Sequence, residues 1–226
     1  YGWESVTVPG AVSAWVSISE RFGKLPFEAL FKPAISYAQR GFIVSPKIAQ
    51  LWALGLGFLS KQSGFMEHFA PNGQAPQAGE RFSNPSLAQS LSLIAETRGK
   101  AFYQGALAQA IVASSKAHGG ALTLNDLAAH KPDWCGTISK GFDNVTLHEI
   151  PPNGQGIAAL IAVGILSHTD IREKDADDPM AIHLQIESMK LALWDTEKYV
   201  VDVDHMAAVT ADNLLNDDYL AARAKL

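Results

Sequence analysis

One short segment constrains the fold of this chain more than any other. Residues 147–150, Leu-His-Glu-Ile, alternate in polarity like a strand, and two prolines end it because proline lacks the N–H that a β-ladder needs. Asn153-Gly154 and Gly156 permit a tight turn with positive φ, and an apolar, alanine-rich helix follows at once. Such a turn leaves N–H groups free to hold an anion or a carbonyl. The alternative is that these prolines and glycines only turn a corner.

Helix signals dominate the rest of the sequence. Proline, glycine and capping residues bound segments whose apolar residues recur at helical spacing. Pro33 falls inside one of these segments, so either the first turn there is extended or the helix restarts. Thr123 with Asp126 predicts a capping box for a short helix. The other helices are expected over 10–22, 26–40, 46–59, 85–97, 105–118, 155–167, about 179–199, and 211–224.

Strand signals are confined to one part of the chain. The period changes towards two after Trp134, and we expect strands over 136–139 and 145–150, joined by a turn within 141–144. Residues 60–83 mix Gly, Pro, Gln and Asn with aromatics, which predicts a short helix and then a loop. This is the best candidate for a flexible region or a boundary. Otherwise 1–226 is predicted to be a single, mainly α unit with a small β component.

Composition excludes several classes of protein. A chain of 226 residues with 47% hydrophobic and 18% charged residues is globular and can bury a real core. The net charge of −5 gives no support to nucleic-acid binding. There is no apolar run long enough for a membrane span. The single cysteine, Cys135, cannot form an internal disulfide, and beside Trp134 it is expected to be a packed thiol.

Common catalytic and metal motifs are absent or weak. The sequence has no dinucleotide or phosphate-loop glycine motif and no Gly-x-Ser-x-Gly. His183 and Glu187 share a helix face but lack a third ligand at metal spacing, so we expect no metal and no cofactor. Adjacent His148 and Glu149 should point to opposite faces of a strand. His118 and His130 are expected to end helices, and an exposed acidic turn before a helix is expected at Asp175, Asp177 and Asp178. A solvated loop or a helix cap is expected at Asp202, Asp204 and His205.

Five motifs, in order along almost the whole chain, carry a family resemblance. The turn Pro151 to Gly156 resembles the Pro-Pro-x-x-x-Gly turn in the large subunit of gamma-glutamyltransferases (gamma-glutamyltranspeptidases). It is most similar to the variant in gamma-glutamyltransferase-like amidohydrolases and acylases. The other four also resemble family segments: Val8-Pro9-Gly10; Phe22 to Phe27 leading to Gly41-Phe42; Phe102 to Gly105 leading to Gly119 to Leu127; and Glu187 to Ala192 followed by Asp195 and Tyr199.

The resemblance implies an N-terminal-nucleophile hydrolase. In that family a precursor cuts itself, and the new terminal threonine of the small subunit attacks the substrate amide. The threonine lies downstream of the matched region, and the arginine that grips the substrate carboxylate lies upstream of Val8. We therefore expect a large-subunit portion of the αββα fold, incomplete without its small subunit and without a catalytic residue of its own. Its substrate-cleft candidates are Asn153, Gly154, Gln155 and Gly156.

Partners follow from the same resemblance. They are a small subunit carrying the threonine nucleophile and a small-molecule amide substrate. Transpeptidases often carry serines within this turn, whereas Asn153 and Gln155 stand here, which puts glutathione in doubt as substrate. The alternative is a stand-alone helical scaffold or binding module without activity, and periplasm and cytoplasm both stay open. A fragment should expose an apolar patch beside the strands and the 155–167 helix, closed by homodimerisation or local disorder.

Overall fold

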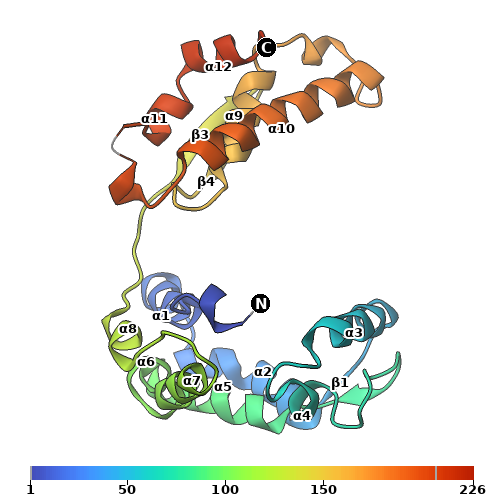
Figure 1. The fold of residues 1–226 in the computed structure, drawn as a ribbon, viewed down its shortest axis with the longest axis vertical. Helices are drawn as coiled ribbons and strands as arrows, with labels where there is room; N and C mark the ends of the chain where they lie inside the picture. The colour runs from blue at the N-terminus through green and yellow to red at the C-terminus, as the bar shows by residue number, and fades with distance from the viewer. Residues whose placement is uncertain (1, 207) are drawn as a thin grey trace. The chain divides into compact units, whose positions relative to one another are not determined.

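The computed structural model describes residues 2–206 and 208–226, which form two compact units, Tyr1–Pro132 and Asp133–Leu226. Figure 1 shows that helices make up most of both units and that the β-structure is limited to short strands. The prediction of a mainly α chain with a small β component is confirmed. The division falls after Pro132 and not within 60–83. The flexibility of 60–83 and the single-unit description of the whole chain stay predictions.

The first unit is a set of helices with one minimal strand pair. Its strands pair antiparallel, with Phe42 opposite Phe82 and Ile43 opposite Arg81. The elements are η1 (Trp3–Ser5), α1 (Ala11–Phe22), α2 (Phe27–Arg40), β1 (Phe42–Ile43), α3 (Pro46–Leu59), α4 (Phe65–Phe69), β2 (Arg81–Phe82), α5 (Pro85–Thr97), α6 (Lys100–Gln104), α7 (Ala106–Ala117) and α8 (Leu124–Ala129).

The helix boundaries of the first unit follow the local chemistry that the sequence predicts. Asn84 accepts a hydrogen bond from Leu87 N–H at 3.0 Å, and Thr123 and Asp126 form the expected capping box. Helix α2 runs unbroken through Pro33, so the helix does not restart there. The core packs α1, α2 and α5 together through five buried side chains: Val12, Phe27, Phe31, Ile94 and Ala95.

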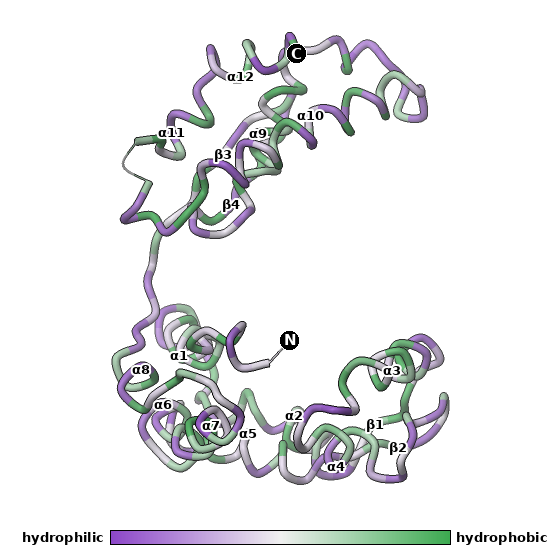
Figure 2. The backbone as a smooth tube through the Cα atoms, in the orientation of Figure 1, coloured by the Kyte–Doolittle hydropathy of each residue, from purple (hydrophilic) through white to green (hydrophobic). Residues whose placement is uncertain are grey.

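The second unit packs a β-hairpin against helices. Its elements are β3 (Ile138–Phe142), β4 (Val145–Glu149), α9 (Ile157–Leu166), η2 (Ile171–Glu173), α10 (Pro179–Tyr199), η3 (Val203–His205), α11 (Ala211–Leu214) and α12 (Asp217–Arg223). Figure 2 shows hydrophobic residues along α9, and burial explains them. Seven of its ten residues are buried, so this helix is the centre of the unit.

Two sequence predictions in the second unit are corrected. Strand β3 spans 138–142 and not 136–139, because the hairpin turns at Asp143-Asn144, where Asp143 takes a positive φ of 56°. The helix predicted over 211–224 is two helices. The Asn216 side chain accepts from Tyr219 N–H at 3.2 Å and so starts a second helix after the first has ended.

A buried ion pair joins α10 to α12. The Asp195 side chain is 3% exposed, and its two oxygens accept from Arg223 Nε at 3.1 Å and Nη2 at 2.9 Å. Arg223 Nη2 also donates to the Leu191 carbonyl oxygen at 3.3 Å. Burial and a hydrogen bond to Asp195 raise the pKa of Tyr219 to about 12. Asp195 is one of the family-like motif residues, and its role here is structural.

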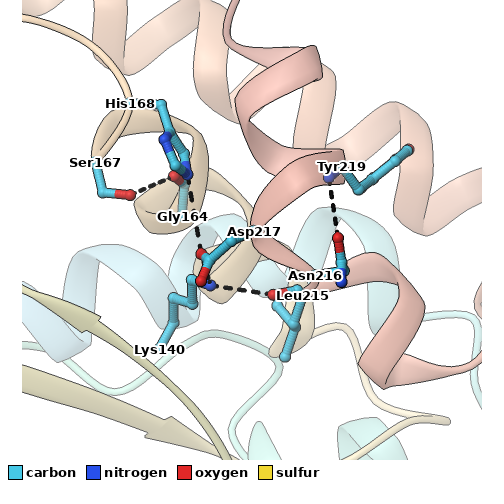
Figure 3. Close-up of polar contacts among 8 residues, drawn as sticks. All are labelled: Lys140, Gly164, Ser167, His168, Leu215, Asn216, Asp217 and Tyr219. Atoms are coloured by element: carbon cyan, nitrogen blue, oxygen red, sulfur yellow. Dashed lines mark hydrogen bonds and ion pairs between the residues drawn. The ribbon is translucent and has the colours of Figure 1, made fainter.

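A second polar cluster fastens the hairpin to the start of α12 (Figure 3). Lys140 reaches from β3 and donates to Asp217 Oδ1 at 2.6 Å and to the Leu215 carbonyl oxygen at 3.0 Å. His168, just after α9, lies with Nε2 3.9 Å from the same carboxylate oxygen. The hydrogen bond and the positive charge of Lys140 hold the pKa of Asp217 below its ordinary value of 3.8.

This cluster predicts a specific pH dependence. Since the folded-state pKa of Asp217 is lowered, its carboxylate stabilises the fold above the unfolded-state pKa, and the contribution is lost as pH falls through the folded-state value. In Asp217→Asn we expect a flatter loss of stability below about pH 4, measured by urea unfolding at a series of pH values. Asp218→Asn, at the neighbouring exposed position, is the control. Identical pH profiles for Asp217→Asn and the parent chain would contradict the assignment.

Candidate functional site

The Pro-Pro-Asn-Gly-Gln-Gly turn connects β4 directly to α9. Pro152 is buried, and Ile157 and Leu160 on the first turn of α9 are fully buried, so the turn is held between two packed elements. The side chains of Asn153 and Gln155 are exposed. The structure therefore presents two amide side chains to solvent from a rigid support, which suits recognition of a polar ligand.

The start of α9 leaves a group of backbone donors free. Ala158 N–H donates to the Gln155 carbonyl oxygen and Ala159 N–H to the Gly156 carbonyl oxygen, both at 3.0 Å. Within residues 2–206 and 208–226, no well-aligned hydrogen bond uses the N–H groups of Gln155, Gly156 and Ile157, whereas a turn over Pro152-Asn153 closes onto Gly154. Free N–H groups at a helix start carry the positive end of the helix dipole. The turn is therefore able to accept an anion or a polarised carbonyl oxygen.

A side chain at position 156 is limited by the space beside Glu149 and not by a positive φ. Gly156 has φ −57°, and neither it nor Gly154 lies in the left-handed region, so that expectation is wrong. A Cβ at Gly156 would come within 3.0 Å of the Glu149 carboxyl carbon and 3.2 Å of its Cβ. At Gly154 it would meet only Ile150, at an ordinary 3.5 Å. The side chain of Glu149 thus folds back over the turn.

Glu149 is the functional candidate that sequence reasoning missed. The register pairs Ile138 with Glu149 and Ser139 with His148, so these two side chains lie on opposite faces of the hairpin, as expected. His148 Nδ1 lies 3.4 Å from Thr137 Oγ1, whereas Glu149 lies against Gly156. The Glu149 carboxyl group lies beside the free N–H groups, so its charge affects which ligands the turn accepts. The sequence feature that could have indicated Glu149 is Gly156, because a glycine leaves room for a neighbouring side chain.

The expected exposed apolar surface lies along the hairpin. On β4, Val145 is 62% exposed and Leu147 37%, and Ile150 at the end of the strand is 58% exposed. A cavity of 550 Å³ between the hairpin, α9 and η2 is lined by Phe142, Asp143, Val145, Leu147, Val163, Leu166, Ile171, Arg172 and Gln185. Helix α9 itself is buried, so the patch belongs to the strands and not to the helix.

Other candidate groups have structural partners. Glu187 forms an ion pair with Lys190 at 2.8 Å, and the Lys190 hydrogen bond lowers the pKa of Glu187, with a smaller contribution from His183. Asp178 and Asp202 cap α10 and η3 through backbone N–H groups, as the sequence predicts. Within the part of the chain that the structure describes, no group of three or more His, Cys, Asp or Glu side chains is placed to hold a metal ion.

Cys135 corrects another expectation. The thiol is exposed and not packed, because it lies in the irregular segment before β3, where the neighbouring Trp134 is 53% exposed. Its Sγ lies 3.8 Å from the Gly136 carbonyl oxygen.

None of the helices among the described residues combines the length and apolar character needed to cross a membrane.

Comparison with solved structures identifies the fold. The chain superposes on a cephalosporin acylase from Bacillus halodurans with a TM-score of 0.94 and 39% identity, covering 100% of this chain and 42% of that one. A gamma-glutamyltranspeptidase from Pseudomonas nitroreducens, complexed with L-DON, gives a TM-score of 0.90 and 30% identity, covering 99% and 66%. The helices and the hairpin are therefore part of an N-terminal-nucleophile hydrolase fold.

The sequence comparison gives the family. A profile described as gamma-glutamyltranspeptidase matches residues 1–226, and the chain belongs to this family. The glutathione hydrolase-like YwrD proenzyme of Bacillus subtilis is 32% identical over 95% of this chain and 41% of its own length. The oxamate amidohydrolase proenzyme of Klebsiella pneumoniae is 33% identical over 89% and 39%. The chain spans about two fifths of these curated relatives, and the resemblance read from its five motifs is confirmed.

Proposed function

We propose that this chain is the large-subunit portion of an enzyme that hydrolyses or transfers gamma-glutamyl or related acyl-amide groups. The chemistry belongs to a threonine at the start of a small subunit, and the chain supplies the helical support and one wall of the cleft. The observation that carries this proposal is the family match over 1–226, together with a share of only about two fifths of the relatives. No side chain of the turn is a nucleophile, which agrees with a supporting role.

Exposed apolar side chains support the need for a partner subunit. Helix α10 packs small buried residues, among them Ala181, Ser188 and Ala192, against the rest of its unit. Its outer side carries a stripe spaced by four, three and four residues, exposed by 39–53%: Ile182, Ile186, Met189 and Leu193. Large apolar residues outside and small ones inside are unfavourable for a helix facing water. A second polypeptide that covers α10 and β4 removes this cost.

The turn is proposed as the part of the chain nearest to substrate. Its free N–H groups and the exposed amides of Asn153 and Gln155 fit a carbonyl or carboxylate group of an amide substrate. The substrates named for relatives differ, since one is a glutathione hydrolase-like protein, one an oxamate amidohydrolase and one a cephalosporin acylase. Because Asn153 and Gln155 stand where transpeptidases typically have serines, we propose that the substrate is an acyl amide other than glutathione.

The first experiment asks where the nucleophile is. The gene is read beyond the codon for Leu226 and the neighbouring genes are searched for a family small-subunit sequence that begins with threonine. The chain is then co-expressed with that sequence, and ammonia or amine release is measured from gamma-glutamyl, oxamate and acylated cephalosporin amides. We expect activity only when both parts are present. Amide hydrolysis by the 226-residue chain alone would contradict the supporting role, and absence of any such partner sequence would favour the stand-alone scaffold without activity.

A glycine substitution tests the turn within that reconstituted enzyme. Gly156→Ala forces the Glu149 side chain away from the turn, and we expect kcat/KM to fall at least about tenfold, since small displacements at a site are costly. Gly141→Ala is the control, because a Cβ there meets nothing within 4 Å. Circular dichroism of both variants checks that the fold is kept. Equal activity of the two variants would remove the turn from the cleft.

A further inference from the structure

A cavity in the first unit, lined by both polar and apolar groups, has no role in the proposed reaction. Its volume is 370 Å³, and it lies between α1 and the short helix α6. Helix α1 contributes Ser13, Val16, Ser17 and Glu20, which recur at the spacing of one helix face, and α6 contributes Lys100, Tyr103 and Gln104 in the same way. Adjacent helices usually meet through apolar faces, so two mostly polar faces around open space indicate a ligand site.

One side of the cavity is fixed by a hydrogen-bonded network. Tyr103 donates to the Pro9 carbonyl oxygen at 2.7 Å and accepts from Ser13 N–H at 3.0 Å. The His130 ring stacks on Tyr103 with centroids 5.3 Å apart, and its Nε2 lies 2.8 Å from Ser13 Oγ. Each of these groups is therefore held in one orientation by two contacts. The wall is pre-organised, which lowers the entropic cost of binding.

Arg98 and Lys100 place positive charge on another side of this cavity. Arg98 has φ 50°, a left-handed conformation at the end of α5 where glycine is usual, and Gly99 follows with φ 78°. The Arg98 guanidinium lies 5.5 Å from the Phe27 ring centroid and pairs with Glu20 at 3.0 Å. The ion pair and the ring contact hold the Arg98 guanidinium beside the cavity.

Lys100 and Gln104 supply donors that nothing else uses. Neither side chain has a hydrogen bond or ion pair with any residue that the structure describes. The charged groups on the cavity are then Arg98 and Lys100 against Glu20. Since Glu20 is paired with Arg98, Lys100 leaves a net positive charge on a chain whose overall charge is −5.

We propose that this cavity binds a small anion through a carboxylate or phosphate group, with Lys100 and Arg98 as the cationic ligands and Gln104 as a neutral donor. Charge-assisted hydrogen bonds from arginine and lysine to carboxylate or phosphate are about twice as strong as neutral ones. Glu20 weakens the site by competing for Arg98. The ligand is held entirely by residues of the first unit.

Binding is measured on the 226-residue chain by calorimetry and by the NMR shift of the His130 ring, with inorganic phosphate and with succinate as separate probes. We expect saturable binding of at least one probe, and the stronger probe identifies the ligand class. Lys100→Gln and Arg98→Gly should each weaken it about tenfold, while Glu20→Gln should strengthen it severalfold. Arg98→Gly should leave the thermal midpoint close to that of the parent, because glycine suits this conformation.

Lys116→Gln is the matched control, since Lys116 is an exposed lysine on α7 outside the cavity. It should leave binding unchanged. Three results would overturn the proposal: no saturable binding of either probe, equal weakening by Lys116→Gln and Lys100→Gln, or Glu20→Gln without any gain. None of these results bears on the family activity, because the assay contains no amide substrate.

Discussion

Replacing Asp195 by alanine should lower the free energy of unfolding of the second unit by about 3–5 kcal/mol. The substitution leaves the Arg223 guanidinium, whose side chain is only 17% exposed, without its carboxylate partner. The cost is the desolvation of an unpaired charge and exceeds the net value of the intact pair. Urea unfolding followed by hydrogen exchange in α9 and α10 measures the effect.

Two further variants separate the loss of the ion pair from a loss of packing. Asp177→Ala, at an exposed aspartate before α10, should change stability little. The double variant Asp195→Ala with Arg223→Met should recover much of the loss, because an apolar side chain of similar length does not need a counter-charge. If the double variant is as unstable as Asp195→Ala alone, the loss comes from packing and the charge explanation is wrong.

Replacing Phe27 by alanine should destabilise the first unit by about 3–5 kcal/mol. Phe27 is 2% exposed, its ring lies 4.9 Å from that of Phe31, and the Arg98 guanidinium lies over it. Removing the ring leaves a cavity in the core of α1, α2 and α5, where the helix backbones cannot collapse to fill it. Hydrogen exchange in α2 and α5 reports the loss directly.

The control for this experiment is Phe58→Ala, because Phe58 is 64% exposed on α3. It should cost less than about 0.5 kcal/mol. Similar losses at the two positions would mean that the buried aromatic pair is not the centre of the first unit. Since Phe27 and Asp195 belong to different units, the two variants also test whether exchange in one unit responds to damage in the other.

The sequence specified local structure wherever a residue's own chemistry decides it. Asn84 and Thr123 start their helices through side-chain oxygens that satisfy free N–H groups, and the pattern shows this without a structure. Prediction of an element's bounds failed where they depend on competition with a neighbouring residue. The break between α11 and α12 depends on Asn216 competing with continuation of a helix. The predicted turn range contains Asp143-Asn144, but β3 was misplaced because Gly141 and Phe142 pair with β4 and extend the strand.

The candidate site divides in the same way. Asn153, Gly154, Gln155 and Gly156 were selected from the sequence, because a strand, a glycine turn and a helix start can leave donors free there and because the turn resembles a family motif. The position of Glu149 over Gly156 could not, since it depends on how a strand end folds back on the turn. The cavity between α1 and α6 joins residues about 90 positions apart, as in the Ser13 to Tyr103 contact, and no local pattern contains it.

The amino-acid sequence alone thus determined the helical class, most helix ends, the family and the turn that borders the proposed cleft. These depend on short-range periodicity, capping and motif order, which are properties of neighbouring residues. Only the tertiary structure decided that Asp195 is a buried partner of Arg223, that Cys135 is exposed, and that an unpaired lysine and a strained arginine face one cavity. Burial and charge pairing between distant segments depend on three-dimensional packing, which local pattern does not encode.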